Sequence, residues 1–285
     1  MPTGPYAAQG GNNTIDVLNL GSDGILADLG NFSATQTTDF PSGLATDTRG
    51  YLYVVNNDPS TFFVPGSVAI YSQNTQTEVG RYSFTGSWYG TPNFPLSIAV
   101  LSNGSKAYVS SERDGGVYDL NTSNPAQPSL TGFITTGANP DGLVLNQSQS
   151  LLYVANAGSD TVSVINTSND VVQQTVLLRP AQFQNIAGTS TPVGLALSPN
   201  GKTLYVALGD LSAIAVLAVN SSGLTLQGYI PGGWYPTGVV APTNTSILVA
   251  YGKGTQTRYP STGYVQWDFN SSPWYDQHLI QGQVA

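Results

Sequence analysis

Apolar residues along this chain fall into short runs, and turns rich in glycine, asparagine and serine separate them. One run, a proline followed by small and apolar residues, occurs five times, beginning at Pro41, Pro95, Pro140, Pro192 and Pro236. Twelve or thirteen residues after each proline comes a second run with the pattern Leu-Tyr-Val or a close variant. The prolines lie 54, 45, 52 and 44 residues apart. A repeat of about 45 residues that contains several short strands is typical of β-propeller blades.

The third repeat is the clearest example of one blade. Its apolar runs predict four strands, at residues 140–145, 151–155, 161–165 and 171–178. The second run is apolar without strict alternation, as in a strand buried on both faces, whereas the third alternates like a half-exposed strand. The turns between them carry Asn, Asp, Gly and Ser, which tolerate tight backbone conformations. We number the strands of each blade from the first, at the axis, to the fourth, at the rim.

This pattern predicts an all-β protein: a β-propeller of four-stranded blades in a single domain over residues 1–285. Five complete blades are expected to start near residues 41, 95, 140, 192 and 236, and a partial blade is expected over 14–40. The partial blade shows only a third and a fourth strand, near residues 14–18 and 25–29. Either residues 1–13 are also structured or the chain is a fragment of a longer protein. We favour the fragment, which implies six to seven blades in the intact domain.

Composition narrows the classes of function. Charged residues make up only 8% of the chain, against roughly 25% in an average domain. The net charge of −8 argues against nucleic acid as a partner. No apolar run is long enough to insert into a membrane. Because few ion pairs can be lost on protonation, we also expect the protein to be acid-stable.

Two strings carry a resemblance to a known family. Residues 152–166, with Leu152-Tyr153-Val154-Ala155-Asn156 followed by Asp160-Thr161-Val162-Ser163-Val164-Ile165-Asn166, resemble the YVTN-repeat family, which includes YncE-like and archaeal surface-layer propellers. The string Leu197-Ser198-Pro199-Asn200-Gly201-Lys202-Thr203-Leu204-Tyr205-Val206 resembles the same family. The likeness covers residues 41 to about 270.

A narrower resemblance lies in residues 230–237, 251–254 and 86–90, with Trp-Tyr pairs in the first and last of these segments. They are similar to the propeller half of proteins that fuse a YncE-like domain to an alkaline-phosphatase-type phosphoesterase. The resemblance implies a secreted accessory propeller. The Asp and His metal ligands of the phosphoesterase half are missing here, so the resemblance implies no phosphatase activity in this chain.

The residues offer little for familiar hydrolytic chemistry. Without cysteine and with His278 as its one histidine, the chain has no thiolate site and no site that needs two imidazoles. A Ser-His-Asp triad would need His278, and no serine lies in a Gly-x-Ser-x-Gly motif. A lactonase-like propeller holding a divalent metal needs convergent oxygen ligands. Glu78 and Glu112 are the two glutamates, and Asp141 is the one carboxylate at the start of a first strand. We therefore expect no catalytic residues, no metal and no cofactor.

Nine Asn-x-Ser/Thr sequons occur in the chain, a number that favours an extracellular acceptor of N-linked glycans. The same sequences are also good turn formers, so both interpretations stay open. Seven lie in turns that an up-and-down blade places on one face, and we predict glycosylation at Asn103, Asn121, Asn146, Asn166, Asn220, Asn244 and Asn270.

The opposite face is expected to carry aromatic and cationic residues in loops, which are typical of a recognition surface. Packing between blades is the other interpretation of its Trp-Tyr pairs. The predicted ligand-binding residues are Trp88, Tyr89, Trp234, Tyr235, Lys253, Arg258 and Tyr259.

These observations favour a non-catalytic, secreted or cell-surface β-propeller that serves as a binding or scaffold module. Its expected partner is an extracellular protein or glycan, or other copies of itself at the cell surface. Two alternatives from other classes stay open. One is a lactonase-like, metal-dependent propeller hydrolase, and the other is a structural subunit of a surface layer or filament.

Overall fold

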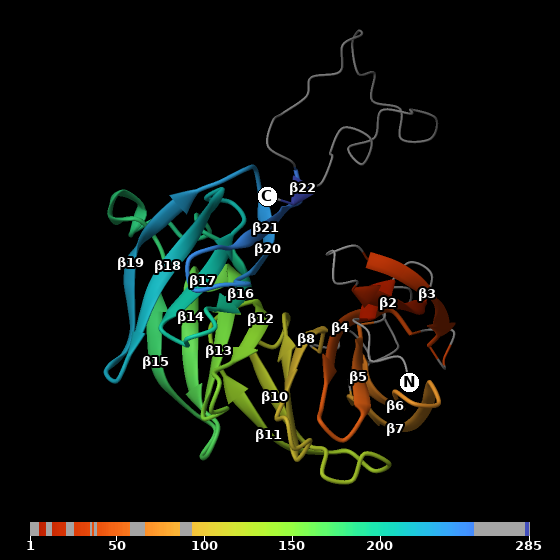
Figure 1. Cartoon of the computed structure of the whole chain (residues 1–285). Helices are drawn as coiled ribbons and strands as arrows, with labels where there is room; N and C mark the ends of the chain where they lie inside the picture. The colour runs from red at the N-terminus through yellow and green to blue at the C-terminus, as the bar shows by residue number, and fades with distance from the viewer. Residues whose placement is uncertain are drawn as a thin grey trace, which may run out of the picture. The chain divides into compact units, whose positions relative to one another are not determined.

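The computed structural model describes residues 6–9, 13–20, 26–34, 36, 39–57, 66–85, 93–253 and 283–284. These residues form strands, together with two one-turn 3-10 helices, η2 (Ala157–Ser159) and η3 (Ala181–Phe183). No helix in the described part of the chain is long and apolar enough to cross a membrane. The strands gather into six sheets, each built from segments consecutive in sequence apart from β22 (Figure 1).

Four of the sheets have four strands. The first blade contains β4 (Pro41–Thr46), β5 (Tyr51–Asn56), β6 (Ser67–Ser72) and β7 (Thr77–Ser83). The second contains β8 (Pro95–Val100), β9 (Lys106–Ser111), β10 (Gly116–Asn121) and β11 (Ser129–Thr135). The third contains β12 (Pro140–Leu145), β13 (Leu151–Asn156), β14 (Thr161–Asn166) and β15 (Val171–Leu177). The fourth contains β16 (Pro192–Leu197), β17 (Thr203–Leu208), β18 (Ala213–Asn220) and β19 (Gly223–Pro231).

The remaining two sheets have three strands each among the described residues. The fifth blade contains β20 (Pro236–Val240), β21 (Leu248–Tyr251) and β22 (Gln283–Val284). The N-terminal sheet contains β1 (Tyr6–Gln9), β2 (Thr14–Leu20) and β3 (Leu26–Ser33).

Each predicted proline is the first residue of a first strand. Proline lacks the N–H that a strand interior needs, so it suits the position where a strand begins. In four of these strands the pairing register shifts just after the proline, for example between Pro41 and Gly43. Gly43 is required there because a Cβ on it would lie 2.7 Å from the carbonyl oxygen of Leu96 in β8. The missing side chain thus lets β4 and β8 approach closely.

The chain divides into two compact units, and the third blade contributes residues to both. The first unit contains residues 1–154 and 164–173, and the second contains 155–163 and 174–285. In the first unit, one core cluster includes Tyr53, Val68 and Leu120, and another includes Tyr108 and Leu152. The core of the second unit has the equivalent tyrosine of β17, Tyr205, packed with residues of β20 and β21.

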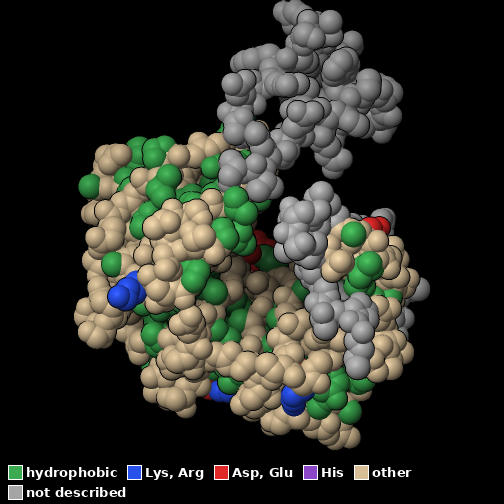
Figure 2. All heavy atoms as spheres, viewed as in Figure 1, with side chains coloured by type: hydrophobic (Ala, Val, Ile, Leu, Met, Phe, Trp, Pro, Cys, Tyr) green, Lys and Arg blue, Asp and Glu red, His purple; other side chains and the backbone are tan. Residues whose placement is uncertain are grey.

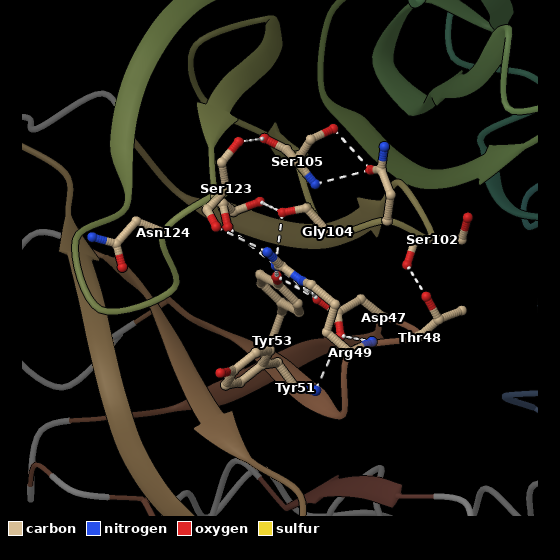
Figure 3. Close-up of polar contacts among 12 residues, drawn as sticks. Asp47, Thr48, Arg49, Tyr51, Tyr53, Ser102, Gly104, Ser105, Ser123 and Asn124 are labelled. Atoms are coloured by element: carbon tan, nitrogen blue, oxygen red, sulfur yellow. Dashed lines mark hydrogen bonds and ion pairs between the residues drawn. The ribbon is translucent and has the colours of Figure 1, made fainter.

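A network around Arg49 in the first unit joins the first blade to the second (Figure 3). Arg49 Nη2 donates to the Tyr53 hydroxyl at 2.8 Å. Arg49 Nε donates to the buried Asp47 carboxylate at 2.8 Å. The same guanidinium donates to backbone carbonyls in turns of the second blade, those of Gly104, Thr122 and Ser123. One cation therefore satisfies three backbone carbonyls at once. Figure 2 shows how sparsely charged side chains are spread over the visible face.

The N-terminal sheet differs from the expectation of a third and a fourth strand alone. Residues 6–9 form β1, which pairs antiparallel with β2 and packs beside β4. The assignment of β2 and β3 as third and fourth strands agrees with their hydrogen bonds. The N–H of Ala34, after β3, donates to the carbonyl of Asn13, just before β2, at 2.9 Å, as Thr136 does to Gly115 in the second blade.

The all-β propeller fold predicted from the sequence is confirmed, with blades starting at the five prolines. That the whole chain is one domain stays a prediction.

Candidate functional site

Asp141 is the second residue of β12, in the first unit, directly after the proline that begins the strand. Its side chain is partly buried. Burial raises the pKa of this carboxyl to about 7, and the negative charge of nearby Glu112 contributes in the same direction. A carboxyl with such a pKa is half ionised at neutral pH, so it can both accept and return a proton there.

Glu112 directly follows β9 in the loop to β10. Its N–H donates to the Phe94 carbonyl at 3.0 Å, and its own carbonyl accepts from Asn139 Nδ2 at 3.4 Å. Asn139 lies two residues before Asp141, and the first strands β8 and β12 are neighbours. These contacts hold the Glu112 loop beside the start of β12.

The next two residues of that loop add a cation and a third carboxylate. The Arg113 guanidinium lies over the Phe94 ring, 4.7 Å from its centroid, and the side chain is exposed. Asp114 accepts 2.7 Å hydrogen bonds from the hydroxyls of Ser111 and Tyr118, which fix the shape of the loop. The loop therefore carries two carboxylates, those of Glu112 and Asp114, and one cation, Arg113, so its net charge is negative.

Three of the buried polar atoms of the first unit that have no hydrogen-bond partner among the described residues lie next to strand ends, on the side of the sheets where β12 begins. They are Asn57 Oδ1 after β5, Asn93 Oδ1 before β8 and Thr136 Oγ1 after β11. A buried, unsatisfied oxygen is costly, so each such atom in a native fold calls for an explanation, such as a bound water or ligand. The side of the first unit where β12 begins therefore carries Asp141, whose pKa is about 7, and buried oxygens that lack a hydrogen-bond partner among the described residues.

No group of three or more His, Asp or Glu side chains in the described part of the chain is arranged to hold a metal ion.

The predicted recognition residues are described in part. Trp234, Tyr235 and Lys253 lie together in the second unit, with Lys253 Nζ 5.2 Å from the Trp234 ring centroid and 4.6 Å from that of Tyr235. The other four, Trp88, Tyr89, Arg258 and Tyr259, lie outside the described residues. Ligand binding by these residues stays a prediction.

Six of the seven sequon asparagines are described: Asn103, Asn146 and Asn244 lie between first and second strands, and Asn121, Asn166 and Asn220 end third strands. Several form side-chain turns: Asn103 Oδ1 accepts from Ser105, Asn121 Oδ1 from Ser123 and Asn166 Oδ1 from Ser168. Asn146 Oδ1 accepts from the N–H of Leu151, and Asn244 Oδ1 from that of Asn200. The side chain of Asn220 is exposed, and Asn270 lies outside the described residues. Each turn bond accounts for asparagine without a glycan, and glycosylation stays a prediction.

Comparison with known proteins connects the fold to lactonases. No family model matches the chain. It is 28% identical over 142 residues to a 6-phosphogluconolactonase of Enterobacter sp. (strain 638), covering 47% of this chain and 40% of that protein. It is 27% identical over 145 residues to a 6-phosphogluconolactonase of Serratia proteamaculans (strain 568), covering 48% and 43%. The matched segment thus spans less than half the length of these curated relatives.

Two solved structures show the same fold. The periplasmic gluconolactonase of Pseudomonas aeruginosa superposes with a TM-score of 0.67 at 20% identity, over 87% of this chain and 78% of that one. A protein from Bacteroides uniformis assigned as a 6-phosphogluconolactonase superposes with a TM-score of 0.68 at 16% identity, over 86% and 73%. The chain therefore has a β-propeller fold of the kind found in these lactonases.

These findings correct the expected function. The interpretation as a non-catalytic binding module, and with it the prediction that the chain is not an enzyme, is wrong, since the curated relatives are lactonases. The sequence was interpreted in terms of metal-dependent and serine-triad chemistry, and a pair of carboxyls acting without a metal was not considered. The YncE-like assignment is not confirmed by the comparisons, and secretion stays a prediction.

The signal for the site was present but incomplete. Asp141 stood out in the sequence as the one carboxylate at the start of a first strand, and Glu112 as one of two glutamates. What the sequence did not reveal is that the fold brings them near each other.

Proposed function

We propose that this protein hydrolyses a small sugar lactone, with Asp141 as the general base and acid. The observation that carries the proposal is the position of Asp141 at the start of the axial strand β12, with its pKa raised to about 7 beside Glu112. The curated lactonase relatives support the class of reaction.

The chemistry follows from the two protonation states of Asp141. The carboxylate takes a proton from a water molecule, and the resulting hydroxide attacks the lactone carbonyl carbon to form a tetrahedral intermediate. When the intermediate collapses, the bond from that carbon to the ring oxygen breaks. The protonated Asp141 then returns its proton to the leaving ring oxygen, so the net reaction is lactone plus water to hydroxy acid.

The neighbours of Asp141 have distinct tasks in this scheme. Burial raises the pKa of Asp141 toward neutrality, and the charge of Glu112 raises it further. Arg113, held on Phe94, offers a positive charge for the developing oxyanion and for the product carboxylate.

The charge of the loop bears on the substrate. Glu112 and Asp114 outnumber Arg113, and the whole chain carries a net charge of −8. A phosphate dianion would be repelled by such a site. We therefore propose an unphosphorylated sugar lactone, such as gluconolactone, in preference to its phosphorylated counterpart.

The test is the rate of acid release from gluconolactone above the spontaneous rate. We expect kcat/KM of the unaltered protein to rise with pH through about 7, because the base must be ionised. Asp141→Asn should lower kcat/KM by at least about a hundredfold. Glu112→Gln should keep activity but move the rising limb to lower pH, because the neighbouring negative charge is gone.

Asp210→Asn is the matched control, since Asp210 is an exposed carboxylate in the second unit. It should leave the rate and its pH profile unchanged. Full activity in Asp141→Asn would refute the role of Asp141. No acceleration of either lactone by the unaltered protein would refute the proposed reaction.

A further inference from the structure

The clearest feature outside the carboxyl site is a lysine held against two aromatic rings in the second unit. Lys253 Nζ lies 5.2 Å from the Trp234 ring centroid and 4.6 Å from that of Tyr235. Both distances are within the range of a cation–π interaction. Lys253 forms no ion pair with a carboxylate in the described part of the chain, unlike Lys106 and Arg179. Its charge therefore remains available to an anion.

Backbone contacts hold this group in place. The N–H of Gly252 donates to the Tyr235 carbonyl at 2.9 Å, and the N–H of Lys253 donates to that of Trp234 at 3.3 Å. The end of β21 is thus tied to the loop between β19 and β20 that carries both aromatic residues. The lysine and the rings are consequently arranged before any ligand arrives, and this lowers the entropy cost of binding.

Tyr235 itself has an unusual backbone. Its φ is 58°, in the left-handed region that non-glycine residues rarely occupy. Close packing sustains this conformation, since a Cβ on Gly209 would lie 3.1 Å from the Tyr235 ring. Residues held in such conformations are concentrated at binding and active sites, where the surrounding structure compensates for the strain.

Trp234 supplies an accessible surface. Its side chain is 43% exposed, although tryptophan is usually largely buried. An exposed indole offers a flat apolar face, and such a face stacks well on the C–H face of a pyranose ring. The Lys253 ammonium lies over the indole, so the pyranose stacks on the part of the indole that the lysine leaves exposed, and its carboxylate can accept from the ammonium.

From this geometry we propose that Trp234, Tyr235 and Lys253 form a binding site for a sugar acid, a pyranose that carries a carboxylate. Trp234 stacks against the ring, Lys253 Nζ donates to the carboxylate, and Tyr235 fixes the position of the lysine. The site is separate in residues from the Asp141 site, and the proposal does not depend on the lactonase activity.

The test measures binding of glucuronate to the whole chain by calorimetric titration, with glucose and acetate as probes that lack the carboxylate or the ring. We expect saturable binding of glucuronate and much weaker binding of glucose and of acetate. Lys253→Met, which keeps most of the aliphatic stem, should weaken glucuronate binding by about tenfold or more. Trp234→Ala should weaken it similarly, and Trp234→Phe should retain most of it.

Lys202→Met is the matched control, because Lys202 is an exposed lysine of the same unit. It should bind glucuronate as the unaltered protein does, and thermal unfolding should show that every variant is folded. Absence of saturable glucuronate binding would overturn the proposal. So would equal weakening by Lys202→Met, which would indicate unspecific attraction by positive charge, or acetate binding as strong as glucuronate binding.

Discussion

The hydroxyl of Tyr108 in β9 donates to Asp170 Oδ1, in the turn between β14 and β15, at 2.7 Å. Lys106 Nζ lies 2.6 Å from the other oxygen of the same carboxylate. A residue of the second blade is thereby bonded to the turn of the third within the first unit. Tyr153, the corresponding tyrosine of β13, is equally buried, but its hydroxyl has no hydrogen-bond partner among the described residues.

This difference predicts opposite effects of the same substitution. Tyr108→Phe removes the hydroxyl that donates to Asp170 Oδ1 and leaves Lys106 on the other oxygen, so it should lower the free energy of unfolding by about 1–2 kcal/mol. Tyr153→Phe removes a buried hydroxyl that gains nothing from the fold, so it should be neutral or stabilising by up to about 1 kcal/mol. Urea unfolding of both variants measures the effects. Equal destabilisation by both would contradict the difference in hydrogen bonding between the two hydroxyls.

Asp160 organises the loop after the third blade. Its carboxylate accepts hydrogen bonds from the N–H groups of residues 188 to 191, at 2.8 to 3.1 Å, and from Arg179 Nε at 2.7 Å. Replacement by asparagine removes the charge and turns one acceptor oxygen into a donor that faces these N–H groups. Asp160→Asn should therefore lower the free energy of unfolding by about 3 kcal/mol. Thermal and urea unfolding would measure it.

The contribution of Asp160 to stability should also depend on pH. Burial acts to raise the pKa of Asp160, but the hydrogen bonds from Thr191, Arg179, Ser190 and Thr189 outweigh it and hold the pKa below its usual value. The stabilisation is then fully present above the unfolded-state pKa of about 4 and is lost only as the pH falls through the lower, folded-state value. Unfolding midpoints from pH 7 to pH 4 should therefore show no loss from this group. An Asp160→Asn penalty that already shrinks between pH 7 and pH 5 would contradict this.

Much of the fold could be predicted because the signals for each blade lie within a short stretch of the sequence. Proline marks where each first strand begins, and the apolar run around residues such as Tyr53 marks the second strand. β1 could not be predicted, since Tyr6–Gln9 is short and contains two alanines, which have little strand preference of their own. Its strand conformation comes from pairing with β2.

The site was less predictable, because its chemistry depends on contacts distant in sequence. The pKa of Asp141 is raised first by burial and then by the charge of Glu112, and both depend on how β12 packs in the fold. The Tyr108–Asp170 bond joins residues 62 positions apart. In contrast, the position of Trp234 and Tyr235 in a loop between strands could be predicted from the sequence, and their role in binding stays a prediction.

The last prediction concerns the stability cost of the proposed catalytic base. The pKa of Asp141 is about 7 in the folded protein and about 4 in the unfolded chain. Between these values the folded state binds more protons at this position than the unfolded state, so its contribution to stability falls as the pH rises. Asp141→Asn removes the penalty of holding a buried negative charge beside Glu112. The variant should therefore be more stable than the unaltered protein at pH 8, by on the order of 1–3 kcal/mol, and nearly equal to it at pH 4.

Urea unfolding at both pH values, combined with lactone hydrolysis, measures this trade-off between stability and activity. A variant that is inactive yet more stable at pH 8 would identify Asp141 as a group retained for chemistry at the expense of the fold. Glu112→Gln should show part of the same stabilisation, because it removes the neighbouring charge but leaves Asp141 buried. Loss of stability in Asp141→Asn at pH 8 would instead mean that the carboxylate makes favourable contacts in the folded state, and its role as a neutral-pH base would then be wrong.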